Sequence, residues 1–470
     1  MSWRRLVSVV VFMVMCFFTT NSYALLTFDD GKLELEGTIS HQSIVRNDTL
    51  HNSKTYYIQG MNIAELEGLY HLIEEPCQAR GIVDKLDLRA IIRGMYDNVY
   101  DVTNEFGAGT GAFSEEEEDD FKSELRLREA YADVYKDKLW LRLGRQQIVW
   151  GKSDFFRLLD IINPLDYSWH FFFEDFDNIR IPQDMALAQY SIGDVGFLRS
   201  LSIQLVVNPG DVQHTRLGRA GEPWALAPPG YELIPQDFPN GPQYGGRIQA
   251  VAGPVSFTIN DYYYYLQGGV FNLGTGELTY PRVNVVGGAI DYYNELTSAV
   301  WRAELTYTPD KEMGIDFTDS SFLSLLGKNS NGIVRKDEVK YVLGVDRPTW
   351  IRWLNQKSTY FLSAQLFMTH VLGHEQAITN DGAAVKKHEA TITLLANSSY
   401  VNGKLTPQIY WAYGVSGDAH IVGPSVNYLI TDNWAVKVGS NIIWGRDTRY
   451  ANFGGFHDND EVYAKISFTF

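Results

Sequence analysis

Cysteine is almost absent from this sequence of 470 residues, which contains only Cys16 and Cys77. Cys16 lies in an N-terminal apolar stretch that we expect to be removed, so the mature chain would keep Cys77 alone. One cysteine cannot form a disulfide within a single chain. Cys16 also follows Met15 rather than a small residue, which argues against a lipid-modified cysteine. We therefore expect Cys77 to be an ordinary structural residue.

The sequence also lacks an apolar run long enough to cross a membrane as a helix. The run Leu6 to Phe18 has 13 residues, whereas a spanning helix needs about 20. It follows Arg4-Arg5 and precedes the small-residue exit Ser22-Tyr23-Ala24. This layout predicts a secretory signal peptide over residues 1–24, with an uncleaved anchor as the alternative. Because no Pro/Ser-rich linker divides the rest, we expect residues 25–470 to form one domain.

An excess of positive charge is missing as well. The net charge is −17, and it becomes −19 when residues 1–24, which hold two arginines and no acid, are removed. Such a chain is repelled by phosphate-rich surfaces, so neither nucleic acid nor an anionic lipid surface is expected as its main partner.

Signatures of catalysis and of metal binding are missing too. The stretch Gly151-Lys152-Ser153 has Gln146 where a phosphate-binding loop requires glycine, and no Gly-x-Ser-x-Gly elbow occurs. The ten histidines show no metal-ligand spacing. We therefore predict no enzyme, no cofactor and no metal. The acidic run Glu115 to Asp120 is a candidate surface Ca²⁺ site, but a solvated, self-repelling loop is the favoured interpretation.

What the sequence does contain is strict alternation, seen best in its last ten residues. Val462, Ala464, Ile466, Phe468 and Phe470 are apolar, and the residues between them are polar or amphipathic. A period of two indicates a strand whose faces meet two different solvents. The terminal aromatic pair Phe468 and Phe470 resembles the signal read by the bacterial outer-membrane assembly machinery.

The same alternation marks eighteen candidate strands, and the gaps between them alternate in length. Long gaps such as 100–123, 151–182 and 209–244 alternate with tight turns such as Lys136-Asp137 and Gly253-Pro254. This rhythm predicts an all-β, transmembrane antiparallel β-barrel of about 18 strands, with 16 as the alternative. Since lipid does not tolerate an open sheet edge, the last strand must pair with the first, Lys32 to Ser40. The predicted strands begin near Lys32, Thr55, Val83, Glu124, Lys138, Gln183, Leu198, Gly245, Val255, Pro281, Leu296, Lys336, Lys357, Val385, Gly403, Asp418, Asn433 and Asp460.

A dense polar region surrounds the hairpin that turns at Lys136-Asp137. Both strands change phase, which we attribute to an extra residue on each, with a bulge at Gly144. After the change, Ile148 and Trp150 are expected to face outward. A structural salt-bridge lattice and a ligand-contacting role remain equally open for this cluster. Its candidate members are Arg126, Arg128, Glu129, Arg142, Arg145, Gln146 and Gln147, of which Glu129, Arg142, Arg145 and Gln147 should gather on the lumen wall.

The loop 151–182 is too apolar to lie in water. Ser153 is placed to cap a short helix over Asp154 to Ile162, and Phe171 to Phe173 add further apolar surface. We expect this partly helical loop to fold into the barrel as a mainly hydrophobic constriction that suits an amphipathic or apolar solute. A purely structural plug is the alternative. The polar residues of the constriction would be Asp154, Arg157, Asp160, Asn163, Asp166 and Arg180.

The stretches "LREAY", "LRLGRQQIVWGKSD", "LDIINPLD" and "RIP" resemble the bacterial outer-membrane family known as domain of unknown function 1302. The resemblance implies a barrel in the outer membrane of a Gram-negative bacterium, in contact with outer-membrane lipid and lipopolysaccharide. It further implies work beside an exporter of the resistance–nodulation–division type with a lipoprotein helper. The acidic run 115–120 and the triple phenylalanine depart from the pattern. The pattern covers Arg126, Glu129, Gly144, Arg145, Gln146, Trp150, Gly151, Asp154, Asp160, Asn163, Pro164 and Asp166.

Taken together, these features predict an outer-membrane channel for a poorly soluble or amphipathic small molecule, and the family resemblance implies that it is the outer-membrane partner of a hydrophobe exporter. One alternative is a structural or docking protein that binds a periplasmic or surface partner. A second is a lipid hydrolase embedded in the barrel, which the missing catalytic signatures disfavour.

Overall fold

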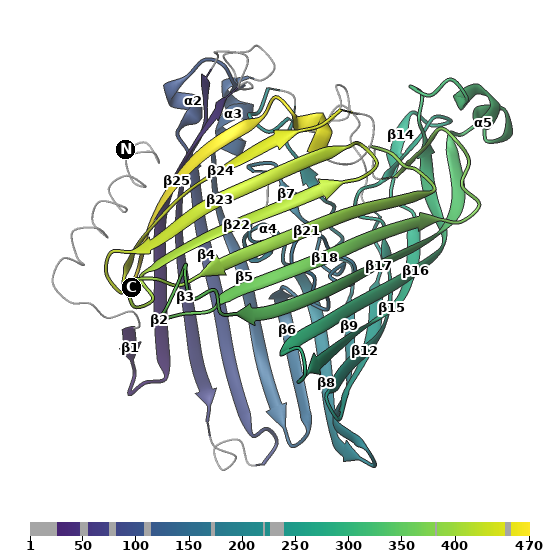
Figure 1. The fold of residues 1–470 in the computed structure, drawn as a ribbon. Coiled ribbons are helices and arrows are strands. Elements are labelled where there is room, and N and C mark those ends of the chain that lie inside the picture. Colours follow the sequence, from purple (N-terminus) through teal and green to yellow (C-terminus); the bar gives the residue numbers. More distant parts are fainter. Residues whose placement is uncertain are drawn as a thin grey trace.

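Eighteen strands form one closed antiparallel barrel in the computed structural model (Figure 1). The model describes residues 26–47, 55–74, 81–107, 114–170, 174–219, 221–225, 239–380, 383–446 and 453–470. The predicted signal peptide, Cys77 and Phe171 to Phe173 lie outside these ranges. All eighteen predicted strands are present, which confirms the larger of the two strand numbers. They are β2 Leu33–Asn47, β3 Thr55–Ile73, β4 Lys85–Asp97, β5 Ser123–Lys136, β6 Leu139–Gln146, β8 Gln183–Val195, β9 Leu198–Asn208, β11 Gln243–Ala252, β12 Val255–Tyr265, β15 Arg282–Asn294, β16 Ala299–Ile315, β17 Ile333–Thr349, β18 Tyr360–Val371, β21 His388–Ser398, β22 Leu405–Gly414, β23 Ala419–Leu429, β24 Trp434–Trp444 and β25 Asp460–Thr469.

The barrel closes where β25 pairs with β2, in register from Thr38↔Thr469 to Asn47↔Asp460. Phe470 extends this pairing, because its N–H donates to the Gly37 carbonyl and its carbonyl accepts from the Gly37 N–H, both at 2.9 Å. The Phe470 ring lies on Gly37 so closely that a Cβ there would be 2.2 Å from the ring. Phe468 packs against Trp434 with ring centroids 4.8 Å apart. The chain therefore ends on a ring that seals the seam.

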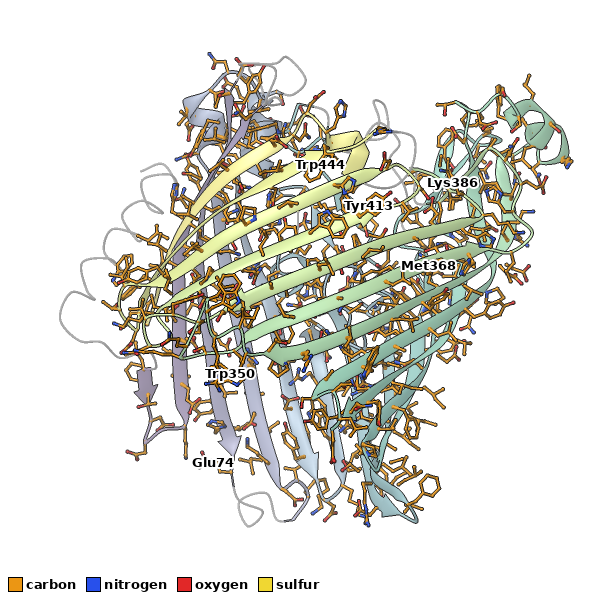
Figure 2. The ribbon with its side chains drawn as sticks, in the orientation of Figure 1. Glu74, Trp350, Met368, Lys386, Tyr413 and Trp444 are labelled. Atoms are coloured by element: carbon orange, nitrogen blue, oxygen red, sulfur yellow. The ribbon has the colours of Figure 1, made fainter. Side chains whose placement is uncertain are left out.

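The two ends of the barrel differ as the gap lengths predict. Figure 2 shows Tyr413 and Trp444 near one end and Trp350 and Glu74 near the other. We call them the long-loop end and the short-turn end. Connections at the short-turn end include the two-residue links 137–138, 196–197 and 253–254, whereas the long-loop end carries 98–122, 147–182 and 209–242.

Short elements decorate the loops and the N-terminus. None of the helices in the described residues is long and apolar enough to span a membrane. The additional strands are β1 Leu26–Phe28, β7 Asp166–Tyr167, β10 Arg216–Leu217, β13 Val270–Asn272, β14 Glu277–Thr279, β19 Ile378–Asn380 and β20 Ala383–Ala384. The helices are α2 Val99–Val102, α3 Glu115–Lys122, α4 Phe176–Ile179, α5 Phe322–Lys328 and the 3₁₀ helix η3 Phe453–Phe456.

The acidic run is helical rather than a self-repelling loop. Ser114 caps α3, because its hydroxyl accepts from the Glu117 N–H at 3.2 Å and the Glu117 carboxylate accepts from the Ser114 N–H at 2.8 Å. Negative charge at a helix N-terminus is favoured by the exposed N–H groups. The acidic side chains therefore stabilise the start of the helix, whereas we expected their mutual repulsion to prevent regular structure. Among the described residues no group of three metal-ligating side chains occurs here or elsewhere.

The lumen is less polar than the alternation suggests. The outward faces carry exposed apolar side chains such as Leu343, Ile442 and Val462. Yet apolar side chains are also buried inside, in clusters formed by the wall and the long loops. Ile44, Ile58, Ile421 and Ile443 belong to one of them. The interior is therefore packed with protein rather than filled only by water.

Of the two extra residues predicted for this hairpin, the one on the first strand is present and the one at Gly144 is wrong. Between β4 and β5 the register moves from Ile91↔Glu129 to Ile92↔Leu127, so Arg128 is the extra residue. The β5–β6 pairing runs without a shift from Lys136↔Leu139 to Ala130↔Arg145. Gly144 is needed for another reason: its φ is +128°, and a Cβ would lie 2.2 Å from the Ala130 carbonyl. Arg128 can still reach the lumen from the bulge, because an arginine side chain is long.

Candidate functional site

The loop between β6 and β8, residues 147–182, crosses the lumen and touches several parts of the wall. We call it the constriction loop. The loop is held together by Asn163, whose side chain is completely buried. The Asn163 amide oxygen accepts from the Ile148 N–H at 2.8 Å, and its NH₂ donates to the carbonyls of Ile181 at 2.9 Å and Gln146 at 3.2 Å. One side chain thus joins the two ends of the loop.

The first part of the loop is bound to strands β15 to β18. The Lys152 N–H donates to Glu304 at 2.5 Å, and its carbonyl accepts from Arg302 at 2.8 Å. Asp154 accepts from Arg302 at 2.8 Å and from Gln365 at 2.6 Å. The predicted helix over 154–162 is therefore wrong: this backbone is irregular, with several bends, and the Ser153 hydroxyl donates to the Phe156 carbonyl at 2.6 Å instead of capping. In the described part of the loop the one helix is α4.

The middle of the loop is bound to the seam strands. Gln59 on β3 donates to the Trp169 carbonyl, and Gln42 on β2 donates to Glu174 at 3.3 Å. The buried His170 ring lies between Glu174, 2.5 Å from Nδ1, and Glu461 on β25, 3.2 Å from Nε2. We call this arrangement the seam latch.

The charges of the seam latch stabilise one another. Burial alone would lower the pKa of His170, but Glu461 and then Glu174 outweigh burial and raise it to about 10. Burial would raise the pKa of Glu174, but the charge and hydrogen bond of His170, together with Lys465 and Gln42, outweigh burial and lower it to about 2. His170 is therefore an imidazolium, and a second loop reaches it through the Trp224 ring, whose centroid lies 4.9 Å away.

The last part of the loop is held by arginines of β4 and β5. Arg93 donates to the Asn178 carbonyl at 2.9 Å, and Arg128 donates to the Asp177 carbonyl. Both carbonyls belong to α4, so the arginines bind the negative end of its peptide dipoles. Within the loop, Arg180 binds Asp160 through two nitrogens at 2.7 and 2.9 Å. Arg126 lies 3.7 Å from Asp166.

The predicted polar cluster is split by the structure. Gln147 donates to Glu129 at 2.7 Å, as expected. Arg142 instead binds Asp133 through two bonds of 2.8 Å, and Arg145 lies apart, beside Asp184 at 3.4 Å and Asp211 at 3.6 Å. Gln146 is fully buried and donates to the Met185 carbonyl at 2.8 Å, so it supports the wall.

Sequence reasoning also misplaced Ile148 and Trp150, which we expected to face outward. Strand β6 ends at Gln146, so both belong to the loop and are buried in the lumen. The Trp150 indole N–H donates to Gln204 at 2.6 Å. The missed signal is the run Gln146-Gln147 before them, because two consecutive polar residues end an alternating pattern.

A cavity of about 420 Å³ lies between the constriction loop, residues 214–217 and the wall strands β12 to β17. We call it the loop cavity. Arg157, Leu158, Ile161 and Tyr167 come from the constriction loop. Sequence analysis did not find the wall residues of this site, since they come from strands far apart in the chain. The main wall residues are Tyr264, Val283, Val285, Thr306, Thr308, Lys311, Glu338 and Lys340.

The charge of the loop cavity is positive. Its lining includes three cations, Arg157, Lys311 and Lys340, and one carboxylate, Glu338, which lies 3.2 Å from Lys311 and 3.1 Å from Lys340. Arg157 donates to the Asn163 carbonyl at 2.6 Å. Burial, together with nearby Arg216, lowers the pKa of His214, which keeps that ring neutral. The cavity therefore combines aromatic and aliphatic surface with a net positive charge, inside a chain of net charge −17.

The same barrel occurs in solved outer-membrane proteins of very different sequence. OccAB3 of Acinetobacter baumannii is 8% identical, covers 93% of this chain and 99% of its own, and has a TM-score of 0.51. OpdK of Pseudomonas aeruginosa, solved with vanillate, is 9% identical, with 93% and 98% covered and a TM-score of 0.51. A BenF-like porin from Pseudomonas fluorescens Pf-5 is 9% identical, with the same coverage and a TM-score of 0.50.

These likenesses show a porin-like fold. No curated protein matches the chain. The family model described as "Protein of unknown function (DUF1302)" matches residues 79–201 and 236–470, which is well over half of the sequence and includes the hairpin motifs that suggested this family. The chain belongs to the DUF1302 family of proteins of unknown function.

Proposed function

We propose that this protein is an outer-membrane channel for an amphipathic small molecule with an anionic head. The observation that carries the proposal is the loop cavity, which places three cations and one carboxylate beside tyrosine and aliphatic surface. Its size is within the range of small-molecule sites. A carboxylate head would be attracted by the lysines, while Leu158 and Tyr264 would contact an apolar body.

The constriction loop supplies the selectivity in this proposal. It is bound at β6, at β15 to β18, at the seam and at β4–β5, so it narrows the lumen as a fixed element. Passage requires that a solute bind and then leave, which favours contacts of modest strength. Arg157 and Lys340, the two partly exposed cations of the loop cavity, meet that need better than the buried Arg180–Asp160 pair.

Planar-bilayer recordings test the proposal. Deletion of residues 154–178 should raise single-channel conductance several-fold, because the barrel keeps its wall and loses its constriction. 4-Phenylbutyrate should block the intact channel, whereas the neutral 4-phenylbutyramide, of nearly the same shape, should not. Lys340→Gln should weaken the block about tenfold by removing one charge-assisted contact. Lys357→Gln, in the turn after β17, is the matched control. Equal block by the acid and the amide would refute an anionic head.

The resemblance-based expectations extend the proposal. Cleavage of residues 1–24, residence in a Gram-negative outer membrane with lipopolysaccharide, and handling by the assembly machinery are part of it. The exporter and its lipoprotein helper remain predictions that co-purification from native membranes would test. A docking protein would bind a partner without conducting a solute, and a lipid hydrolase would turn over lipid without conductance. No observation in the described residues favours either function.

A further inference from the structure

The barrel wall has a local gap between β23 and β24. The two strands pair from His420↔Trp444 to Val422↔Ile442 and again from Ser425↔Gly439 to Leu429↔Ala435. Gly423 and Pro424 take no part in this ladder, although they pair normally with Tyr410 and Ile409 on the other side. The gap lies in the middle of the strands, away from both ends of the barrel.

The physical cause of the gap is Pro424. Proline has no N–H to donate to β24, and prolines are rare inside central strands for this reason. In lipid, the unpaired backbone group of the partner strand finds no water to replace the lost bond. This gap is therefore the place in the β23–β24 pair where the two strands are most easily separated.

An aromatic side chain covers the gap from inside. The Tyr410 ring lies directly on Gly423, where a Cβ would be 2.1 Å from the ring. The Tyr410 hydroxyl donates to Asn441 on β24, so this side chain reaches from β22 across β23 to β24 and lies over the gap. Rotation of this one side chain would uncover the gap from the lumen.

Apolar side chains connect the loop cavity with Tyr410. Leu158 lines the cavity and packs in one cluster with Val342, Phe367 and Phe156. The Phe156 ring lies 5.1 Å from Phe367, and the ring of its neighbour Phe155 lies 5.7 Å from Tyr410. A continuous apolar track thus runs from the cavity, along the constriction loop, to the gap.

We propose that apolar solutes exchange laterally between the lumen and the bilayer core through the β23–β24 gap, with Tyr410 as its cover. The inference rests on the proposed function, because the solute must first reach the loop cavity. It adds a second route: the membrane interior, rather than only the far aqueous side, receives or supplies the apolar molecule. A solute with an apolar body gains from that route, since it avoids water altogether.

A disulfide between β23 and β24 tests the lateral route. In a Cys77→Ser background, Val422→Cys with Ile442→Cys places a pair beside the gap, on positions that are register partners. Leu343→Cys with Leu366→Cys is the matched control, on register partners of β17 and β18. The probe is N-phenyl-1-naphthylamine, whose fluorescence rises on entering a bilayer, added to cells that express each variant. Oxidation should slow probe entry only for the gap pair, and reduction should restore it.

Pro424→Val provides a second variant that does not depend on disulfide formation. Valine restores an N–H that can pair with β24, so probe entry should fall about tenfold, as expected when one more backbone hydrogen bond must break before the gap opens. Conductance and 4-phenylbutyrate block are recorded for the same proteins. If 4-phenylbutyrate still blocks the conductance but probe entry is the same for the gap variants and the control pair, the lateral route is overturned and the proposed channel function stands. If block and conductance are absent as well, the proposed function fails too.

Discussion

His170 in the constriction loop lies 3.2 Å from Glu461 on the last barrel strand, although 291 residues separate them in the sequence. Neither residue belongs to a recognisable motif. The contact joins the element that narrows the lumen to the strand that closes the barrel, and it is the most deeply buried charge pair between them.

The seam latch should hold the middle of the constriction loop. His170→Ala leaves the Glu461 carboxylate without its charged partner, which we expect to destabilise the loop's docking by about 3–5 kcal/mol. Single-channel recordings should then show larger and noisier conductance. His71→Ala is the matched control, because His71 lies 2.7 Å from Asp87 and has no hydrogen bond or ion pair with the described part of the loop. Identical traces for His170→Ala and His71→Ala would contradict a latching role.

The latch should resist changes of pH across the physiological range. His170 has a raised pKa, so its stabilising contribution is complete below its ordinary pKa of 6.5 and is lost as the pH rises through about 10. Glu174 has a lowered pKa, so its contribution is present above its ordinary 4.5 and is lost as the pH falls through about 2. Conductance recorded from pH 5 to pH 11 should stay level at first and rise only near the alkaline end. A step between pH 6 and pH 7 would mean that His170 is not held between two carboxylates.

Asn163 should be needed to hold the two ends of the constriction loop together. Asn163→Ala leaves three buried backbone groups without partners, which should cost roughly 2–5 kcal/mol. Asn163→Asp can still accept from Ile148 but cannot donate to the Gln146 and Ile181 carbonyls, so it should not rescue. Limited proteolysis of folded barrels should cut the loop in both variants. Protection equal to that of the unsubstituted protein would show that the other anchors suffice.

Gly37 should be required for a sealed seam. Gly37→Val puts side-chain atoms where the Phe470 ring lies, which should destabilise the barrel by about 1–3 kcal/mol through overpacking. Gly94→Ala serves as the comparison, because a Cβ there would have its nearest contact at 3.7 Å. The measurement is the temperature at which the folded barrel loses its compact migration in detergent gels. Equal temperatures for the two variants would rule out the ring as a seal.

The strands could be predicted because alternation is a local signal that the lipid–lumen boundary imposes on each strand separately. Closure followed from the same physics, since an unpaired edge is costly in lipid. The inward-folded loop was also predictable, because its apolar content needs cover.

The details of the site were not predictable, because they depend on contacts between distant segments. The partners of Asp154 are Arg302 and Gln365, and the partner of His170 is Glu461; no spacing in the sequence joins them. The second predicted bulge, at Gly144, was wrong for a related reason. Gly144 carries a conspicuous local signal, whereas Arg128 is unmatched only in relation to β4. Register is a property of two strands and cannot be read from one.

The seam latch also constrains the order of events during biogenesis. The Glu461 carboxylate lies on the strand that closes the barrel, so the latch contact forms only when β25 has taken its place beside β2. The middle of the constriction loop therefore has its full set of partners only in the closed barrel. Narrowing of the lumen at this point is thus coupled to closure of the wall.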